Sequence, residues 1–183
     1  MPLVCYSWGT TPEERSLDFP CDSVIPEVDD VYQRGITIES SPEIVFRWLC
    51  QLRIGMYVLG RKDSPDLAPQ FDALAVGQAV MDFFEIVSYV YNKHLTIRTK
   101  PGTLESKIYG DVAVSYVVIP ENEQRCRLLV RTRIRYPRIL GILLRFALPW
   151  GDLIMMRRQM QNLKKLSEQM QTSQKTFSES VHP

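Results

Sequence analysis

The spacing of apolar residues changes abruptly near the N-terminus of this 183-residue chain. In the stretch "RGITIE", residues 34–39, Ile36 and Ile38 alternate with polar residues, which is typical of a half-buried strand. Ser41 and Pro42 then provide a capping hydroxyl followed by a proline suited to the first helical turn. Beyond them the apolar residues recur every three or four positions. The pattern therefore predicts a strand, a sharp stop and an amphipathic helix.

Most of the following chain has the patterns of β-strands. Residues 79–90 and 95–99 predict one hairpin, and residues 111–119 and 125–136 predict a second one around a polar loop. One face of the last strand is apolar, and the other carries Arg127, Arg131, Arg133 and Arg135. We interpret this alternation as a sheet with one buried and one solvated face. Binding of nucleic-acid or lipid phosphates by the arginines is the less favoured alternative, since no aromatic residues interleave with them.

The C-terminal part of the chain predicts a long helix. Residues 138–148 are apolar on nearly every side, so we expect this part to be deeply buried or to lie beneath a neighbouring element. Pro149 is expected to kink or break the helix. From Leu153 to Met170, apolar residues recur at helical spacing. A docking of residues 138–156 on a bilayer surface, with transient membrane contact, stays open as an alternative to core packing.

The distribution of these segments predicts one domain. Residues 31–170 hold all the periodic elements and are numerous enough to bury a substantial core. Residues 1–30 have little periodicity and predict an extended N-terminal arm that wraps the domain or stays loose. The polar residues 171–183 predict a disordered tail.

Strands between two helices indicate an α+β domain in which the last helix covers the sheet. The order of "ITIESSPEIVFRWLCQLR", "GRKDSPDL", "VMDFFEI", "LTIRT" and "DLIMMRRQMQNLKKL" resembles the helix-grip superfamily of START-like lipid-transfer domains, polyketide cyclases and birch-pollen-allergen-like proteins. These are also called SRPBCC proteins, and the chain most resembles an uncharacterised bacterial branch of them. The resemblance spans residues 30–170 and implies a curved antiparallel sheet wrapped around the C-terminal helix, with a hydrophobic cavity between them. It implies no single activity.

Composition and charge narrow the function classes. The net charge of +1 provides no global attraction to nucleic acid or anionic membranes. The first twenty residues lack both a basic start and a long apolar run, so we expect a cytoplasmic protein. The cysteines have no metal-ligand spacing, and we expect them to be reduced and to bind no metal; they are Cys5, Cys21, Cys50 and Cys126.

Strand parity predicts which side chains face the C-terminal helix. They are Phe84, Ile86, Tyr116, Val130, Thr132 and Ile134, and Tyr57 is expected at the cavity mouth. Such a lining is mostly apolar with a few hydroxyls, which suits a hydrophobic small molecule or lipid. We therefore expect a carrier or sensor with no catalytic residues and no cofactor, whose partner is not nucleic acid.

Two other functions stay open from the sequence. One is a cyclase- or dehydratase-like enzyme for a polyketide or similar apolar substrate, with Tyr116, His94 or Glu85 as acid or base. The other is a protein-interaction module with a filled core. Converging polar groups in a cavity would favour the enzyme, and the absence of a cavity would favour the module. The oligomeric state is left open.

Overall fold

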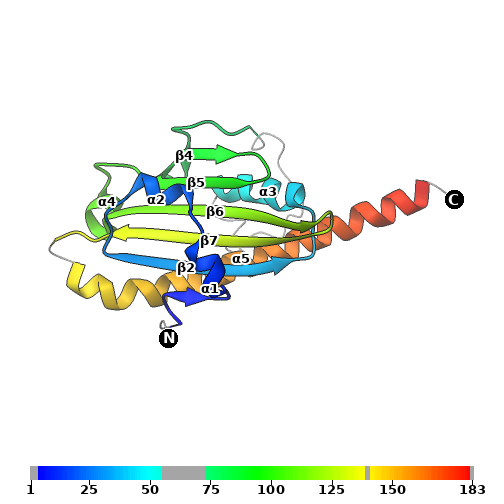
Figure 1. Ribbon diagram of the computed structural model, residues 1–183. Helices are drawn as coiled ribbons and strands as arrows, with labels where there is room; N and C mark the ends of the chain where they lie inside the picture. The colour runs from blue at the N-terminus through cyan, green and yellow to red at the C-terminus, as the bar shows by residue number, and fades with distance from the viewer. Residues whose placement is uncertain (1–3, 55–72, 139–140, 182–183) are drawn as a thin grey trace.

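A computed structural model describes residues 4–54, 73–138 and 141–181 of the chain. In these residues seven strands form one sheet in the spatial order β1-β2-β7-β6-β5-β4-β3 (Figure 1). All neighbouring strands pair antiparallel except β1 and β2, which are parallel. The strands are β1 (Ser7–Trp8), β2 (Asp30–Ile38), β3 (Ala79–Val80), β4 (Phe84–Val90), β5 (His94–Thr99), β6 (Asp111–Asn122) and β7 (Arg125–Arg135). The predicted α+β class and mainly antiparallel sheet are confirmed.

Helices cover both faces of this sheet. The long helix α5 (Gly141–Val181) crosses one face, together with α3 (Pro42–Cys50) and the 3-10 turn η1 (Gln51–Ile54). The short helices α1 (Pro12–Ser16) and α2 (Pro20–Val24) lie on the opposite face (Figure 1). Helix α4 (Leu104–Tyr109) connects β5 to β6. The sheet therefore has an inner face toward α5 and an outer face toward α1 and α2.

The helix start predicted at Ser41 is confirmed. The Ser41 hydroxyl accepts a hydrogen bond from the backbone N–H of Ile44, and Pro42 occupies the first turn. The cap satisfies an amide that has no partner within the helix. The apolar residues of α3 from Val45 onward are buried, so α3 closes one end of the inner face.

The strand register arranges the inner-face side chains in rows across the sheet. One row holds Arg34 on β2, Val130 on β7 and Tyr116 on β6. The next row, nearer the start of α5, holds Tyr32, Thr132 and Val114 on the same strands. Side chains opposite each other in adjacent strands lie close enough to touch. The side chains of both rows therefore face α5.

Helix α5 is a single helix with Pro149 inside it, so the break that was one of the two expectations for Pro149 does not occur. The helix runs to Val181, where the sequence predicts a disordered tail. No glycine or proline follows Gly151 until the end of the helix, so nothing in that part of the sequence breaks it. Pro149 lacks an N–H, so the carbonyl of Arg145 loses its usual helical partner.

The expected deep burial of residues 138–148 is wrong. Ile142 and Phe146 are each 77% exposed and Leu143 is 70% exposed. A helix that is apolar on all sides needs neighbours on all sides to bury it. This part of α5 has the sheet on one side only, so its opposite side faces solvent.

The N-terminal arm folds against the outer face of the sheet. Its strand β1 pairs with β2, and Thr11 and Glu14 form a reciprocal capping box at the start of α1. The apolar residues of the arm pack against β6 and β7; this cluster contains Phe19, Cys21, Ile25, Ala113 and Leu129. The outer face therefore has a small core of its own.

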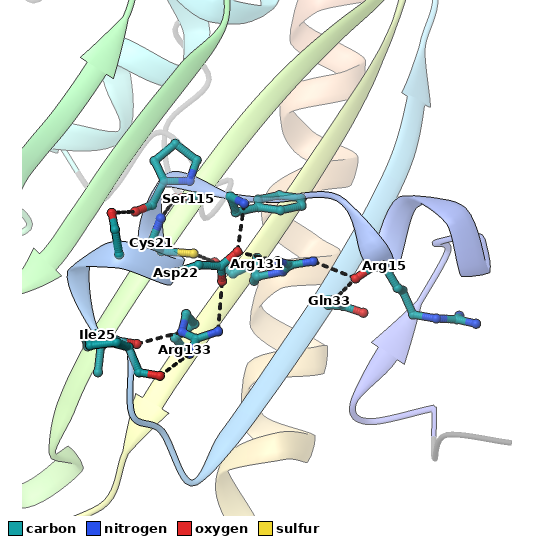
Figure 2. Close-up of polar contacts among 12 residues, drawn as sticks. Arg15, Cys21, Asp22, Ile25, Gln33, Ser115, Arg131 and Arg133 are labelled. Atoms are coloured by element: carbon teal, nitrogen blue, oxygen red, sulfur yellow. Dashed lines mark hydrogen bonds and ion pairs between the residues drawn. The ribbon is translucent and has the colours of Figure 1, made fainter.

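The arginines of β7 lie beneath this arm, so the expected solvated face is wrong for three of the four. Asp22 accepts hydrogen bonds from Arg131 at 2.6 Å and from Arg133 at 2.9 Å, as Figure 2 shows. Glu14 pairs with Arg127 at 2.6 Å, and of these four arginines only Arg135 is exposed. Sequence periodicity shows which residues share a face but not what covers that face.

Candidate functional site

A cavity of about 440 Å³ lies between the inner face of the sheet and the first half of α5. The sheet contributes mainly apolar side chains from β2 and β4 to β7, and α5 forms the opposite wall. The lining residues are Tyr32, Met81, Phe83, Phe84, Ile97, Thr99, Tyr109, Val112, Val114, Tyr116, Thr132, Ile134, Leu148, Gly151, Asp152, Met155, Met156 and Gln159. The cavity is thus a space left between the sheet and α5, bounded by side chains of both.

Four of the seven residues predicted to bind a ligand line this cavity: Phe84, Tyr116, Thr132 and Ile134. Ile86 and Val130 belong to the hydrophobic core and do not line it. Val130 lies in the same row as Tyr116, one row farther along the sheet than Thr132, and belongs to the hydrophobic core that also contains Met160 of α5. Tyr57 lies outside the described residues. Contact of any of these residues with a ligand stays a prediction.

A buried ion pair beside the cavity is the main feature that the sequence did not reveal. Arg34 is completely buried, and its Nη2 donates to the Oδ2 of Asp152 at 2.7 Å. The same guanidinium donates to the backbone carbonyls of Cys5 and Gln33. Arg34 shares the parity of Ile36 and Ile38, so its burial could have been anticipated, but no sequence pattern pointed to Asp152.

Burial changes the acidity of the Asp152 carboxyl. Removal from water raises its pKa from 3.8 to about 6, and the positive charge of Arg34 opposes this rise. Because Asp152 also lines the cavity, it places there a carboxyl that exchanges its proton close to neutral pH.

Three more polar groups face the cavity near this carboxyl. The Tyr116 hydroxyl donates to the Oε1 of Gln159 at 3.1 Å, and burial raises the pKa of Tyr116, which therefore stays protonated. Thr132 is buried, and its hydroxyl has no hydrogen-bond partner among the described residues. A buried hydroxyl without a partner is energetically unfavourable, so a ligand atom or water that reaches Thr132 gains a hydrogen bond.

A tyrosine pair fixes the wall of the cavity on β2. The hydroxyls of Tyr32 and Tyr136 are 2.6 Å apart, and Tyr136 donates to the Oδ2 of Asp30 at 2.8 Å. Tyr32 must then donate to Tyr136, since the Tyr136 proton is already used. Burial raises the pKa of both phenols, so this chain holds its protons and acts as a structural support.

Two of the three residues suggested for an enzyme lie away from the cavity. Neither His94 nor Glu85 lines it, and their strand parity places them on the face opposite to Phe84 and Ile97. The His94 Nε2 lies 3.1 Å from the Ser88 hydroxyl, and partial burial lowers the pKa of His94. Only Tyr116, of the three, has access to the cavity.

The described residues form no metal centre, because no three histidine, cysteine or acidic side chains gather among them. All four cysteines are buried, and none of them forms a disulfide bond. Burial raises the pKa of Cys126 to about 12 and also raises that of Cys21. These two thiols are therefore protonated and unreactive at neutral pH.

Comparison with known proteins identifies the fold. No family model and no curated protein matches the sequence. Protein jhp0584 from Helicobacter pylori matches 83% of this chain and 96% of its own, with a TM-score of 0.56 and 12% identity. MLL2253 from Mesorhizobium loti matches 74% of this chain and 95% of its own, with a TM-score of 0.51 and 17% identity.

Norcoclaurine synthase from Thalictrum flavum also matches, over 83% of this chain and 93% of its own, with a TM-score of 0.52 and 12% identity. A point mutant of that enzyme, with a TM-score of 0.50, is in complex with a transition-state analogue. Identities this low establish a common fold and not a common activity. The chain therefore has the helix-grip fold of the birch-pollen-allergen-like, or SRPBCC, proteins.

Proposed function

We propose that this protein binds a hydrophobic small molecule or lipid between the sheet and α5, as a carrier or sensor without catalysis. The observation that carries this proposal is the cavity of about 440 Å³ with its mainly apolar lining. Ligand sites typically have such a volume and combine an apolar wall with a few polar groups. A protein-interaction module with a filled core has no need of such a space.

The polar groups suggest what the ligand carries. The lining offers the carboxyl of Asp152, the unpartnered hydroxyl of Thr132 and the linked pair Tyr116 and Gln159. Oxygen acceptors dominate this set, and Arg34 is already engaged by Asp152. We infer an apolar molecule with one hydrogen-bond donor, such as a hydroxyl or amine, rather than a carboxylate.

The comparisons support the coarse kind of partner. Norcoclaurine synthase, which shares the fold, is solved with a small molecule bound. Two of the similar structures come from Helicobacter pylori and Mesorhizobium loti. We also propose that the chain belongs to a bacterial branch of proteins with this fold and that it is cytoplasmic. Both of these proposals rest on the sequence pattern.

Filling the cavity at Gly151 is expected to abolish ligand binding. Gly151 lines the cavity, and a Cβ added there meets no atom within 4 Å. Gly151→Phe should therefore fold normally while its ring occupies the ligand space, with at least about a tenfold loss of bound ligand. Native mass spectrometry, followed by solvent extraction of the denatured protein, measures the ligand that co-purifies.

Gly151→Ala is the matched control, because it adds only a methyl group and should keep the ligand. Ile154→Phe, on an exposed position of the same helix that does not line the cavity, should keep it as well. A wild-type protein with no bound mass, and no thermal shift with a panel of lipids and polyketides, would contradict the proposal. The interaction module would then become the better explanation.

A cyclase- or dehydratase-like enzyme is the second candidate, and Asp152 is the observation that favours it. Its pKa of about 6 suits proton transfer at neutral pH, and the Tyr116 hydroxyl lines the same cavity. Incubation with polyketide-like substrates separates the two functions. Product formation that Asp152→Asn abolishes, while ligand binding persists, would favour the enzyme.

A further inference from the structure

The first half of α5 carries an exposed row of large apolar side chains, which we call the apolar stripe. Its members are Ile142 (77% exposed), Leu143 (70%), Phe146 (77%), Trp150 (54%) and Ile154 (61%). They recur at helical spacing on the side of α5 away from the sheet, and Figure 1 shows these first turns, in yellow, along the edge of the molecule. The stripe extends for roughly 20 Å along the helix axis.

The described residues of this chain do not cover the stripe, so packing within the chain does not explain its apolar character. Apolar residues scattered singly over a surface are normal, but a contiguous row of this size marks an interaction site. The inner side of the same turns already contacts the body of the protein, with Pro149 and Leu153 buried. The outer side is therefore available for a partner.

The charges around the stripe indicate the partner. Residues 135–158, which contain the stripe, hold five arginines and a single acidic residue, Asp152. One of the five, Arg145, pairs with Asp29. Asp152 is neutralised by Arg34. Exposed basic side chains flank the stripe on both sides: Arg135 and Arg138 precede it, and Arg157 and Arg158 follow it. A basic rim around an exposed row that includes Phe and Trp is the pattern of a helix that lies in a membrane surface.

We propose that the apolar stripe docks into the surface of an anionic bilayer, with its flanking arginines against the lipid headgroups. None of the helices among residues 4–54, 73–138 and 141–181 is long and apolar enough to cross a bilayer, so α5 would lie in the interface and not span it. The net charge of +1 does not oppose this, since headgroup attraction depends on the local patch.

A second copy of the chain is a poorer occupant for the same surface. Two stripes packed antiparallel would place Arg138 of one copy beside Arg157 of the other, and two packed parallel would align identical arginines. Both arrangements bring like charges together at each end of the contact, which opposes association. An anionic bilayer meets the basic flanks with opposite charge.

Docking would also bring the cavity to the membrane. Leu148, Gly151 and Met155 line the cavity and lie on the same turns of α5 as Trp150 and Ile154. A ligand could then exchange with the bilayer through this wall. This consequence rests on the proposed function, whereas docking itself does not.

Co-sedimentation with vesicles tests the docking. The wild-type protein is expected to pellet with vesicles of phosphatidylcholine and phosphatidylserine, and less with phosphatidylcholine alone or at high salt. The double variant Phe146→Ser with Trp150→Ser should weaken binding at least about tenfold, because it has neither aromatic ring to bury in the bilayer. Arg157→Glu with Arg158→Glu should remove the preference for phosphatidylserine.

Val76→Ser is the matched control, because Val76 is 68% exposed, lies before β3 and is not part of the stripe. It should pellet like the wild type, and unchanged circular dichroism establishes that each variant is folded. Wild-type protein that stays in the supernatant with both vesicle types overturns the proposal. A dimer in light scattering that Trp150→Ser dissociates, without vesicle binding, would assign the stripe to a second copy.

Discussion

Replacing Arg34 by methionine is expected to lower the free energy of unfolding by about 3–5 kcal/mol near pH 7. Arg34 is completely buried, and its guanidinium is the partner of the Asp152 carboxylate. Its loss leaves a buried negative charge without a counter-charge, and also leaves the carbonyl of Cys5 without the donor it has now. Urea denaturation followed by circular dichroism measures the difference.

The size of this effect should depend on pH in a defined direction. The pKa of Asp152 in the folded protein, about 6, lies above its ordinary value of 3.8. The free energy of unfolding therefore falls as the pH rises from 3.8 to about 6, because Asp152 ionises more readily in the unfolded chain. Above about pH 6 this residue causes no further change. Without Arg34 the folded pKa rises further, so this decline continues to higher pH. The stability deficit of Arg34→Met should accordingly be smaller at about pH 5 than near pH 7.

The double variant Arg34→Met with Asp152→Leu provides the control. It removes both charges, and a buried pair replaced by apolar residues of similar size often loses little stability. We expect it to recover most of the deficit and to lose the added pH dependence. A deficit that is equal at both pH values, or that the double variant does not recover, would show that Arg34 stabilises the fold mainly through its contacts with the backbone.

Replacing Asp22 by alanine is expected to cost about 2 kcal/mol and to release the N-terminal arm from the sheet. Asp22 accepts from both Arg131 and Arg133, and the side chain of Arg131 is only 7% exposed (Figure 2). Removing the carboxylate leaves two partly buried guanidiniums facing each other without a counter-charge. Limited trypsin digestion should then cleave at Arg15, whose carbonyl now accepts from Arg131.

Asp18→Ala is the matched control for this prediction. Asp18 is exposed on the same arm, four residues before Asp22, and makes no ion pair among the described residues. It should leave both the stability and the cleavage rate unchanged. Equal behaviour of the two variants would mean that Phe19 and Ile25, and not the ion pairs, hold the arm in place.

The two variants concern opposite faces of the sheet, and their effects on the cavity should differ. Arg34 holds the carboxyl that lines the cavity, so its loss should also reduce ligand binding if Asp152 contacts the ligand. Asp22 lies on the outer face, and its ion-pair partners, Arg131 and Arg133, do not line the cavity. Ligand binding by folded Asp22→Ala protein should therefore equal that of the wild type.

Local patterns determined the longer elements of this fold. The alternation around Ile36 and Ile38, and the Ser41-Pro42 cap, predicted β2 and the start of α3 because they depend only on neighbours in the chain. The alternation of residues along the strands also identified the inner face, and with it Phe84, Thr132 and other residues that line the cavity. It could not separate them from Val130, because both kinds of residue face α5.

Only the tertiary structure decided what covers each face. The solvated appearance of Arg131 and the buried appearance of Phe146 were both misleading, since burial depends on elements distant in the sequence. The pairing of Arg34 with Asp152 joins residues 118 positions apart, and no local pattern encodes that distance. The sequence by itself determined the longer strands, the helices α3 and α5, and the alternation of their apolar positions, but not the short elements β1, α1, α2 and α4. The tertiary structure decided where a cavity remains, which charges meet and which apolar side is left for a partner, because these depend on how elements distant in the sequence pack together.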